Sequence, residues 1–167
     1  TRGTGAAVRY IAAALDSIGL SFSARITGTV PMVLEGLHEK RIIRHSPAHL
    51  SERTWWIRSI PEGTQAVVAE NSAVSPELQP LPSKWLDPGL IVWTSLLPDH
   101  ADCWGPQLSG AREALLRGVP GNSRLLLGNQ AGQDLELVLA LKKMGCDLFS
   151  VGQTKEELPR PHETIAL

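Results

Sequence analysis

The stretch from Gly3 to Gly28 constrains the fold more than any other, because it places a helix and a strand on either side of one glycine. Apolar residues recur at steps of three and four over residues 6–18, which predicts a helix with one buried face. Gly19 ends this helix, and the alternation of apolar and polar residues over 20–26 predicts a strand with one buried face. A helix followed at once by a strand is typical of α/β proteins.

The rest of the chain continues this alternation. Further helices are expected at 31–41, 108–116 and 135–143, and further strands at 53–60, 65–70, 90–97, 124–128 and 146–151. The order predicts an α/β fold with a mainly parallel sheet and helices on both faces, in a single domain over residues 1–167. The segment 53–70 interrupts the rhythm and is expected to form a small β-hairpin, as a lid or at an edge.

Ligands of such sheets bind at the carboxyl ends of the strands. A site is therefore expected among the loops 27–30, 98–106, 128–132 and 152–154. The glycines at positions 3 and 5 add a possible ligand contact, since they would give a ligand close access to the N–H groups at the start of the first helix.

Charge and composition exclude several classes of protein. The net charge of −1, without any basic or acidic block, argues against a nucleic-acid-binding protein. The longest apolar run, 90–97, is too short to span a membrane, and no signal peptide is visible. Cys103 and Cys146 have no motif spacing, so we expect free thiols and a cytoplasmic protein. Because the chain opens at Thr1 and enters folded structure at once, we expect a trimmed or partial chain.

Isolated polar residues offer little sign of a catalytic or metal site. His45 and His49 have the spacing of two metal ligands on a helix, but Pro47 lies between them, so surface loop histidines are the better interpretation. Polar residues also crowd the loop after the apolar run, at Asp99, His100, Asp102 and Cys103. That loop lies where an α/β active site is expected, although loops are commonly polar.

Trp55 and Trp56 are adjacent on an expected strand, so their side chains should point to opposite faces. We expect one to pack inward and the other to cover a lid or a partner surface.

Taken together, these segments resemble the ribokinase-like (PfkB) carbohydrate kinases. In that family a Gly-Gly-x-Ala-x-Asn run opens a helix, and here Gly5, Ala7 and Arg9 occupy the places of the second glycine, the alanine and the asparagine. Thr54 stands where the lid strands of the family carry a threonine. Asn129 stands where a strand of the family ends in Asn-x-x-Glu.

The resemblance implies a sugar or nucleoside kinase that transfers a phosphoryl group from ATP, with Mg, to a substrate hydroxyl. It implies substrate binding by Gly5, Arg9 and Thr54, and a link to phosphate and magnesium for Asn129. The C-terminal Gly-x-Gly-Asp of the family, which carries its catalytic aspartate, has no counterpart, so no catalytic residue is assigned. We therefore expect part of such a kinase, or a degenerate form of it, with a small-molecule substrate.

Two other interpretations stay open. The chain is alternatively a non-enzymatic α/β module that binds a ligand or a partner subunit through the Trp55–Trp56 segment, and a homodimer through 53–70 is one form of this. It is also compatible with a half-domain of another transferase, since similar helix entrances occur in enolpyruvyl transferases.

Overall fold

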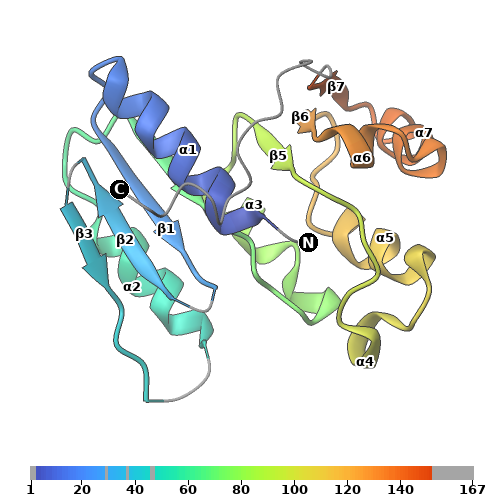
Figure 1. Ribbon diagram of the computed structural model, residues 1–167, viewed down its shortest axis with the longest axis horizontal. Coiled ribbons are helices and arrows are strands. Elements are labelled where there is room, and N and C mark those ends of the chain that lie inside the picture. The colour runs from blue at the N-terminus through green and yellow to red at the C-terminus, as the bar shows by residue number, and fades with distance from the viewer. Residues whose placement is uncertain (1–2, 29, 37, 46–47, 152–167) are drawn as a thin grey trace, which may run out of the picture. The chain divides into compact units, whose positions relative to one another are not determined.

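The computed structural model describes residues 3–28, 30–36, 38–45 and 48–151. The chain divides into two compact units (Figure 1). The N-terminal unit runs from Thr4 to Ser72. The C-terminal unit begins at Ala73, and Gly3, although it precedes the N-terminal unit in the sequence, is grouped with the C-terminal unit. That both units belong to a single domain stays a prediction.

The N-terminal unit is built on a mixed four-stranded sheet of order β3-β2-β1-β4. Its elements are α1 (Thr4–Ser17), β1 (Phe22–Ile26), β2 (Met32–Glu35), β3 (His38–Arg41), α2 (Leu50–Ser59) and β4 (Ala66–Ala69). β1 pairs antiparallel with β2 and parallel with β4, so it lies inside the sheet. The first helix and strand are confirmed where the sequence predicts them.

β1 is buried along its whole length, although its sequence alternates apolar and polar residues. Its apolar residues share a core with α1 that includes Val8, Ala12, Phe22, Ala24 and Ile26. Its polar residues bond to α2: the Trp56 indole Nε1 donates to Ser23 Oγ over 3.0 Å, and Arg25 Nη2 donates to Glu52 over 2.9 Å. The alternation therefore reflects two buried faces of different chemistry, and the expectation of one solvent-facing side was wrong.

The helix predicted over 31–41 is also wrong, because these residues form β2 and β3. Gly36 has a φ of +57°, a left-handed conformation that suits glycine and turns the chain back on itself. β3 then pairs antiparallel with β2, and residues 32–34 of β2 are buried. The spacing of the apolar residues is compatible with a helix as well as with a strand. The turn at Gly36 allows the chain to form the β2–β3 hairpin instead of a helix.

The β-hairpin predicted over 53–70 does not form. Residues 53–59 belong to the helix α2, which buries Trp56 at 0% exposure and leaves Trp55 58% exposed. β4 pairs with β1 instead, in parallel. Aromatic and β-branched residues favour a strand locally, but here one helical face packs on the sheet.

The C-terminal unit is built on a parallel three-stranded sheet of order β5-β6-β7. Its elements are η1 (Pro76–Leu78), α3 (Leu81–Leu86), β5 (Ile91–Trp93), α4 (Ala101–Trp104), α5 (Leu108–Leu116), β6 (Arg124–Leu127), α6 (Asn129–Gly132), α7 (Leu135–Lys143) and β7 (Asp147–Ser150). The predicted α/β alternation is confirmed here, with β5 shorter than the predicted strand. The chain as a whole is an α/β protein with one parallel and one mixed sheet.

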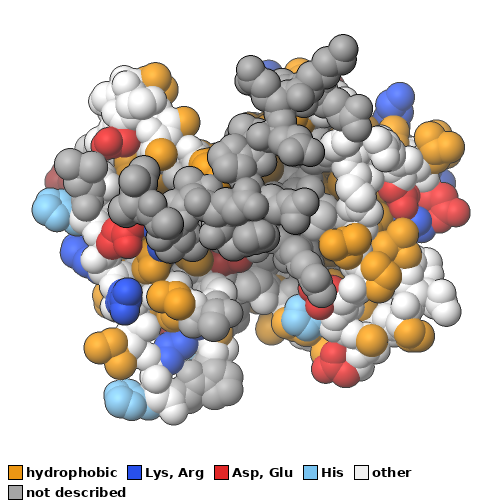
Figure 2. Space-filling model, in the orientation of Figure 1, with side chains coloured by type: hydrophobic (Ala, Val, Ile, Leu, Met, Phe, Trp, Pro, Cys, Tyr) orange, Lys and Arg blue, Asp and Glu red, His pale blue; other side chains and the backbone are white. Residues whose placement is uncertain are grey.

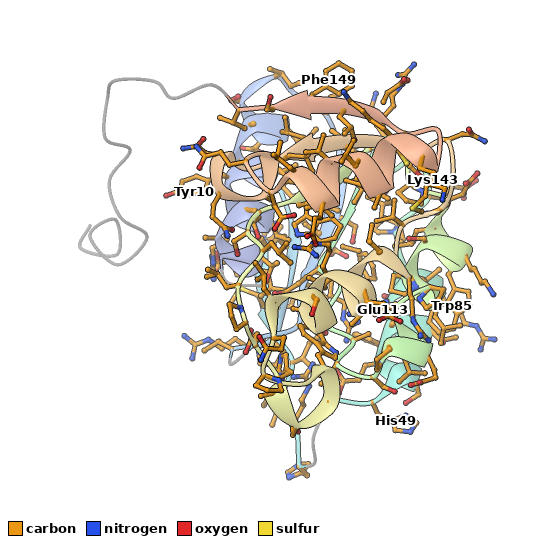
Figure 3. The ribbon with its side chains drawn as sticks, turned by 90° about the vertical axis from the view of Figure 1, so that its right-hand side faces the viewer. Tyr10, His49, Trp85, Glu113, Lys143 and Phe149 are labelled. Atoms are coloured by element: carbon orange, nitrogen blue, oxygen red, sulfur yellow. The ribbon has the colours of Figure 1, made fainter. Side chains whose placement is uncertain are left out.

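The C-terminal unit packs around an apolar core. Its buried members are Trp93, Leu96, Trp104, Ala111, Ala114, Val119, Leu125, Leu127, Ala131, Leu137, Leu141 and Cys146. At the end of β6 a Cβ on Gly128 would lie 2.2 Å from the Thr94 carbonyl oxygen, so only glycine fits there. β7 borders this sheet, and its Phe149 is 53% exposed (Figure 3).

On the face drawn in Figure 2, acidic and basic side chains of the described residues are interspersed over the surface. Among the residues that the structure describes, no helix combines the length and the apolar character needed to cross a bilayer.

Candidate functional site

The carboxylate of Glu70 is the centre of a buried polar cluster in the N-terminal unit. Glu70 follows β4 and is 7% exposed. Its Oε2 accepts hydrogen bonds from the Thr27 amide over 2.6 Å, the Thr27 hydroxyl over 2.9 Å and the Gly28 amide over 3.2 Å. Its Oε1 accepts from the Thr4 hydroxyl. One buried carboxylate thus joins three separate segments of the chain.

The parallel pairing of β1 and β4 brings these segments together. Arg25 lies opposite Ala69 in the ladder, so Thr27 and Glu70 both follow the carboxyl ends of their strands. Thr4 is the first residue of α1, a helix of 14 residues whose N-terminus carries partial positive charge. The cluster therefore lies at the strand edge where α/β proteins bind ligands.

Glycine allows the chain to pass close to this edge. A Cβ on Gly5 would lie 3.3 Å from Ile26 Cγ2, and a Cβ on Gly28 would meet no atom within 4 Å. The first turn of α1 thus packs directly on the end of β1, while the turn after β1 has open space beside it.

Arginines on the α2 side of the sheet support the cluster. Arg44 Nη1 donates to the Thr27 carbonyl over 3.1 Å, and Arg53 Nη2 donates to the Glu70 carbonyl over 3.1 Å. Glu52 of α2 accepts from Arg44 Nη2 over 2.7 Å and from Arg25 Nη2 over 2.9 Å. The backbone on both sides of the Glu70 carboxylate is therefore held by buried or half-buried cations.

Burial and the neighbouring charges of opposite sign act in opposite directions on the pKa values of these groups. Burial lowers the pKa of Arg53 to about 10, helped by the nearby charge of Arg25 and opposed by Glu70. Burial also lowers the pKa of Arg25, against the attraction of Glu52. The hydrogen bond from Arg44 lowers the pKa of Glu52, so this carboxyl is ionised at neutral pH. Arg25 Nε is buried without a partner among the described residues.

The donor set of the cluster suits a hard cation and phosphate groups. A carboxylate and two threonine hydroxyls offer the oxygen ligands that Mg²⁺ prefers, and a helix N-terminus attracts phosphate. Within the described part of the chain, no group of three or more His, Cys, Asp or Glu side chains could hold a metal ion. A metal at Glu70 would therefore share its coordination sphere with ligands other than protein carboxylates.

The residues predicted to bind substrate are not gathered in one place. Gly5 is in the first turn of α1 beside the Glu70 cluster. Arg9, one helical turn later, donates to Glu39 of β3 over 2.8 Å and is 46% exposed. Thr54 is half-buried on α2, where the sequence predicted a lid strand. Their substrate-binding roles stay predictions.

Asn129 lies in the C-terminal unit as the first residue of α6, and its Oδ1 accepts from Gln133 Nε2 over 3.0 Å. Its predicted link to phosphate and magnesium stays a prediction. The polar loop 98–106 contains α4, and His100 there packs edge-on against Trp104. The predicted ligand loop 152–154 lies outside the described residues.

His49 does not form the metal pair considered for it. It caps α2, with its Nδ1 accepting from the Ser51 amide over 3.3 Å.

The sequence interpretation missed Glu70 because its segment was assigned to an antiparallel hairpin. The usable signal was the run Ala-Val-Val-Ala-Glu over 66–70, an apolar strand that ends in a carboxylate. If this run is assigned to a strand parallel to the strand over 20–26, Glu70 lies beside the loop 27–30. That loop was predicted from the sequence to be part of a ligand site.

Comparison with known proteins gives a fold. No family model matches the chain, and no curated protein matches it. Solved structures that are similar include an S73A mutant of L. casei FPGS, folylpolyglutamate synthetase, at 15% identity and a TM-score of 0.59. The apo form of L. casei FPGS has 14% identity and a TM-score of 0.57, and an FPGS–AMPPCP complex has 15% and 0.59. Each match covers 90% of this chain and 43% of the FPGS chain.

These matches correct the family suggested by the sequence. The solved structures that the fold resembles are FPGS and not ribokinase-like (PfkB) kinases, so the carbohydrate-kinase interpretation was wrong. A helix followed at once by a strand is common to α/β proteins in general, which is why the pattern did not distinguish between families. The chain spans less than half the length of the FPGS structures that it matches.

Proposed function

We propose that the chain is the ATP-binding part of an ATP-dependent ligase related in fold to FPGS, and that Mg-ATP binds at the Glu70 cluster. The observation that carries the proposal is the buried Glu70 carboxylate, which joins the start of α1 to the turn after β1. An FPGS structure of the same fold contains AMPPCP, an ATP analogue.

The residues present fit magnesium and phosphate. Glu70 and the hydroxyls of Thr4 and Thr27 would supply oxygen ligands to the cation. The N-terminus of α1 would face the phosphates, since Gly5 leaves its first turn without a bulky side chain. Arg44 and Arg53 hold the carbonyls of Thr27 and Glu70 and add positive charge behind them.

Bound Mg-ATP would supply the phosphoryl-transfer energy that drives the joining of two substrates. In this arrangement Glu70 binds and orients the cation, and Thr27 fixes the position of the Glu70 carboxylate. The acceptor is a small-molecule substrate, as predicted from the sequence. Its binding and the ligation step would involve regions of a longer chain that the FPGS structures contain and this sequence does not match.

Calorimetric titration with AMPPCP in the presence of Mg²⁺ tests the proposal. We expect saturable binding that weakens at least tenfold when Mg²⁺ is removed by EDTA and by a similar factor in Glu70→Gln, because the amide carries no charge for the cation. Glu113→Gln serves as the matched control, since Glu113 lies on α5 with a side chain that is 76% exposed.

Circular dichroism must first show that Glu70→Gln is folded. Equal AMPPCP affinity in the wild type and in folded Glu70→Gln would show that the nucleotide does not bind at this carboxylate. No binding to the wild type at millimolar AMPPCP would remove the proposed function altogether.

A further inference from the structure

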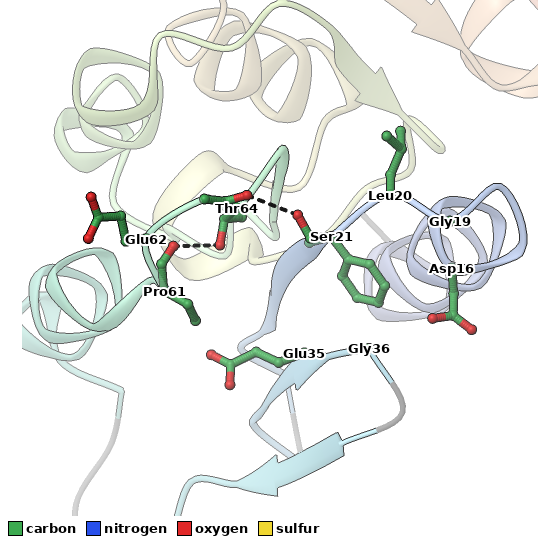
Figure 4. A pocket seen from close by; sticks show the side chains of 11 residues that line it. Asp16, Gly19, Leu20, Ser21, Glu35, Gly36, Pro61, Glu62 and Thr64 are labelled. Carbon is green, nitrogen blue, oxygen red and sulfur yellow. Dashed lines mark hydrogen bonds between the residues drawn. The ribbon is translucent and has the colours of Figure 1, made fainter.

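A pocket of about 410 Å³ lies at the amino end of β1, whereas Glu70 lies beyond the carboxyl ends of β1 and β4 (Figure 4). Four segments of the N-terminal unit line it: the end of α1, the start of β1, the turn after β2 and the loop before β4. Its lining residues are Asp16, Gly19, Leu20, Ser21, Phe22, Glu35, Gly36, Pro61, Glu62, Gly63 and Thr64. Its volume is in the range of small-molecule sites, which run from about 300 to 1,000 Å³.

The hydroxyl groups of the pocket have already donated their hydrogens. Ser21 Oγ donates to the Gly63 carbonyl over 3.0 Å, and Thr64 Oγ1 donates to the Pro61 carbonyl over 2.7 Å. Gln65 Oε1 accepts from the Ser21 amide over 3.0 Å and so fixes the loop to the start of β1. The hydroxyl oxygens are left as acceptors, so a molecule that bonds to them has to bring the hydrogen-bond donors.

The charged residues that line the pocket are all acidic. Asp16, Glu35 and Glu62 supply three carboxylates, and none of the lining residues is basic. Asp16 also lies in the last turn of α1, at the negative end of the helix dipole, where a carboxylate is unfavourable and a cation is favoured.

The chain itself already places an ammonium group at this pocket. Lys40 Nζ of β3 donates to Glu35 Oε2 over 2.9 Å, and the Lys40 side chain is 68% exposed. The lining carboxylate therefore accepts an ammonium in the geometry present. Because Lys40 is mostly in water, it holds this position only weakly.

We propose that this pocket binds a small aliphatic amine, with its ammonium group on the carboxylates and its carbon stem against Leu20, Phe22 and Pro61. In Figure 4 Asp16 and Glu62 lie on opposite sides of the view with Glu35 between them, so the carboxylates come from different sides of the pocket. The site is separate from the Glu70 cluster and does not depend on nucleotide binding there.

Titration with cadaverine, followed by NMR of the backbone amides, tests the site. We expect shifts confined to the lining residues and an affinity that falls with added salt, because the attraction is between partly exposed charges. Pentanediol has the same stem without charge and is expected to bind at least tenfold more weakly. Nα-acetyl-lysine amide, titrated in parallel, distinguishes a lysine side chain of a polypeptide from a free diamine as the source of the ammonium.

Two variants with opposite expected effects keep the proposal falsifiable. Asp16→Asn combined with Glu62→Gln removes two of the three carboxylates and is expected to weaken cadaverine binding about tenfold, with Glu113→Gln as the neutral control. Lys40→Gln frees Glu35 and is expected to strengthen binding about threefold, a gain that misfolding cannot produce.

Equal shifts with pentanediol, shifts spread over the whole surface, or unchanged affinity in both variants would overturn the proposal. AMPPCP binding is expected to stay the same in all these variants, so a failure here is distinct from a failure at Glu70.

Discussion

The two units of this chain differ in what they bury. Of the six buried polar or charged side chains among the described residues, five lie in the N-terminal unit: Ser23, Arg25, Thr27, Arg53 and Glu70. The C-terminal unit buries only Gln79 of this kind, beside a core of twelve buried residues that are all apolar or cysteine. Burying charge is expensive unless the charges are paired, so a fold that needs only stability avoids it.

The difference indicates that the C-terminal unit is a scaffold and that the N-terminal unit contains the candidate site. The C-terminal unit is organised as a scaffold, in which close packing of apolar residues supplies the stability. The N-terminal unit contains a buried network that holds one carboxylate at the end of two parallel strands, and a network of this kind is typical of a site. The following changes test that contrast, beginning with the largest expected effect.

Glu52→Ala is expected to destabilise the N-terminal unit by about 3–5 kcal/mol, because it leaves Arg25 and Arg44 without their shared carboxylate. Urea unfolding gives the total loss, and hydrogen exchange shows whether it falls on residues 4–72. Glu113→Ala, at an exposed carboxylate of the other unit, should change stability by less than about 0.5 kcal/mol. A loss of similar small size for both variants would mean that the buried charges contribute no more than a surface pair.

Leu137→Ala is expected to destabilise the C-terminal unit by about 3 kcal/mol, because Leu137 is fully buried and its removal leaves a cavity. Leu139→Ala on the same helix is the matched control, since Leu139 is 66% exposed and should be close to neutral. Thermal unfolding measures both variants. AMPPCP affinity should be unchanged in Leu137→Ala below its melting temperature, and a large change would contradict the role of this unit as scaffold.

Asp134→Ala has the smallest expected effect, about 1 kcal/mol, from loss of the N-cap of α7. Burial tends to raise the pKa of Asp134, but hydrogen bonds from Arg112 and the Leu137 amide outweigh it and lower the pKa. A lowered folded-state pKa stabilises above the unfolded value of about 3.9, and this stabilisation disappears as pH falls through the folded-state value.

The penalty of Asp134→Ala should therefore be full at neutral pH and shrink in acid. Unfolding free energies measured from pH 7 down to pH 3 check this, with Asp134→Asn as a variant that keeps the cap and loses the charge. A penalty independent of pH would show that the ion pair with Arg112 adds nothing to the cap.

The sequence predicted well those elements whose signal is local. The signals that begin and end two helices lie within a few residues of them. Gly19 follows the end of α1, and α7 has Asp134 before its first residue and two lysines in its last turn. Strand β6 is a short apolar run that ends at a glycine, and it was predicted for the same reason.

Elements decided by distant partners were missed. The segment 53–59 has the composition of a strand, and it is a helix because Trp56 and Arg53 find partners on β1 and beyond β4. The sequence does not contain those partners as neighbours, since Ser23 and Glu70 lie 33 and 17 residues away. The candidate site was missed with them, because Glu70 joins Thr4 and Thr27 only when β4 pairs in parallel with β1.

The burial of β1 between two helices also sets the order in which the N-terminal unit can fold. β1 and β2 are neighbours in sequence and can pair early, whereas β4 joins β1 across the 44 positions that separate Phe22 from Ala66. Closing so long a loop slows folding. The polar face of β1 gains its partners only once α2 has docked, so until then its serine and arginine are kept in water. Burial of the Trp56 indole against Ser23 should therefore be a late event in the folding of this unit.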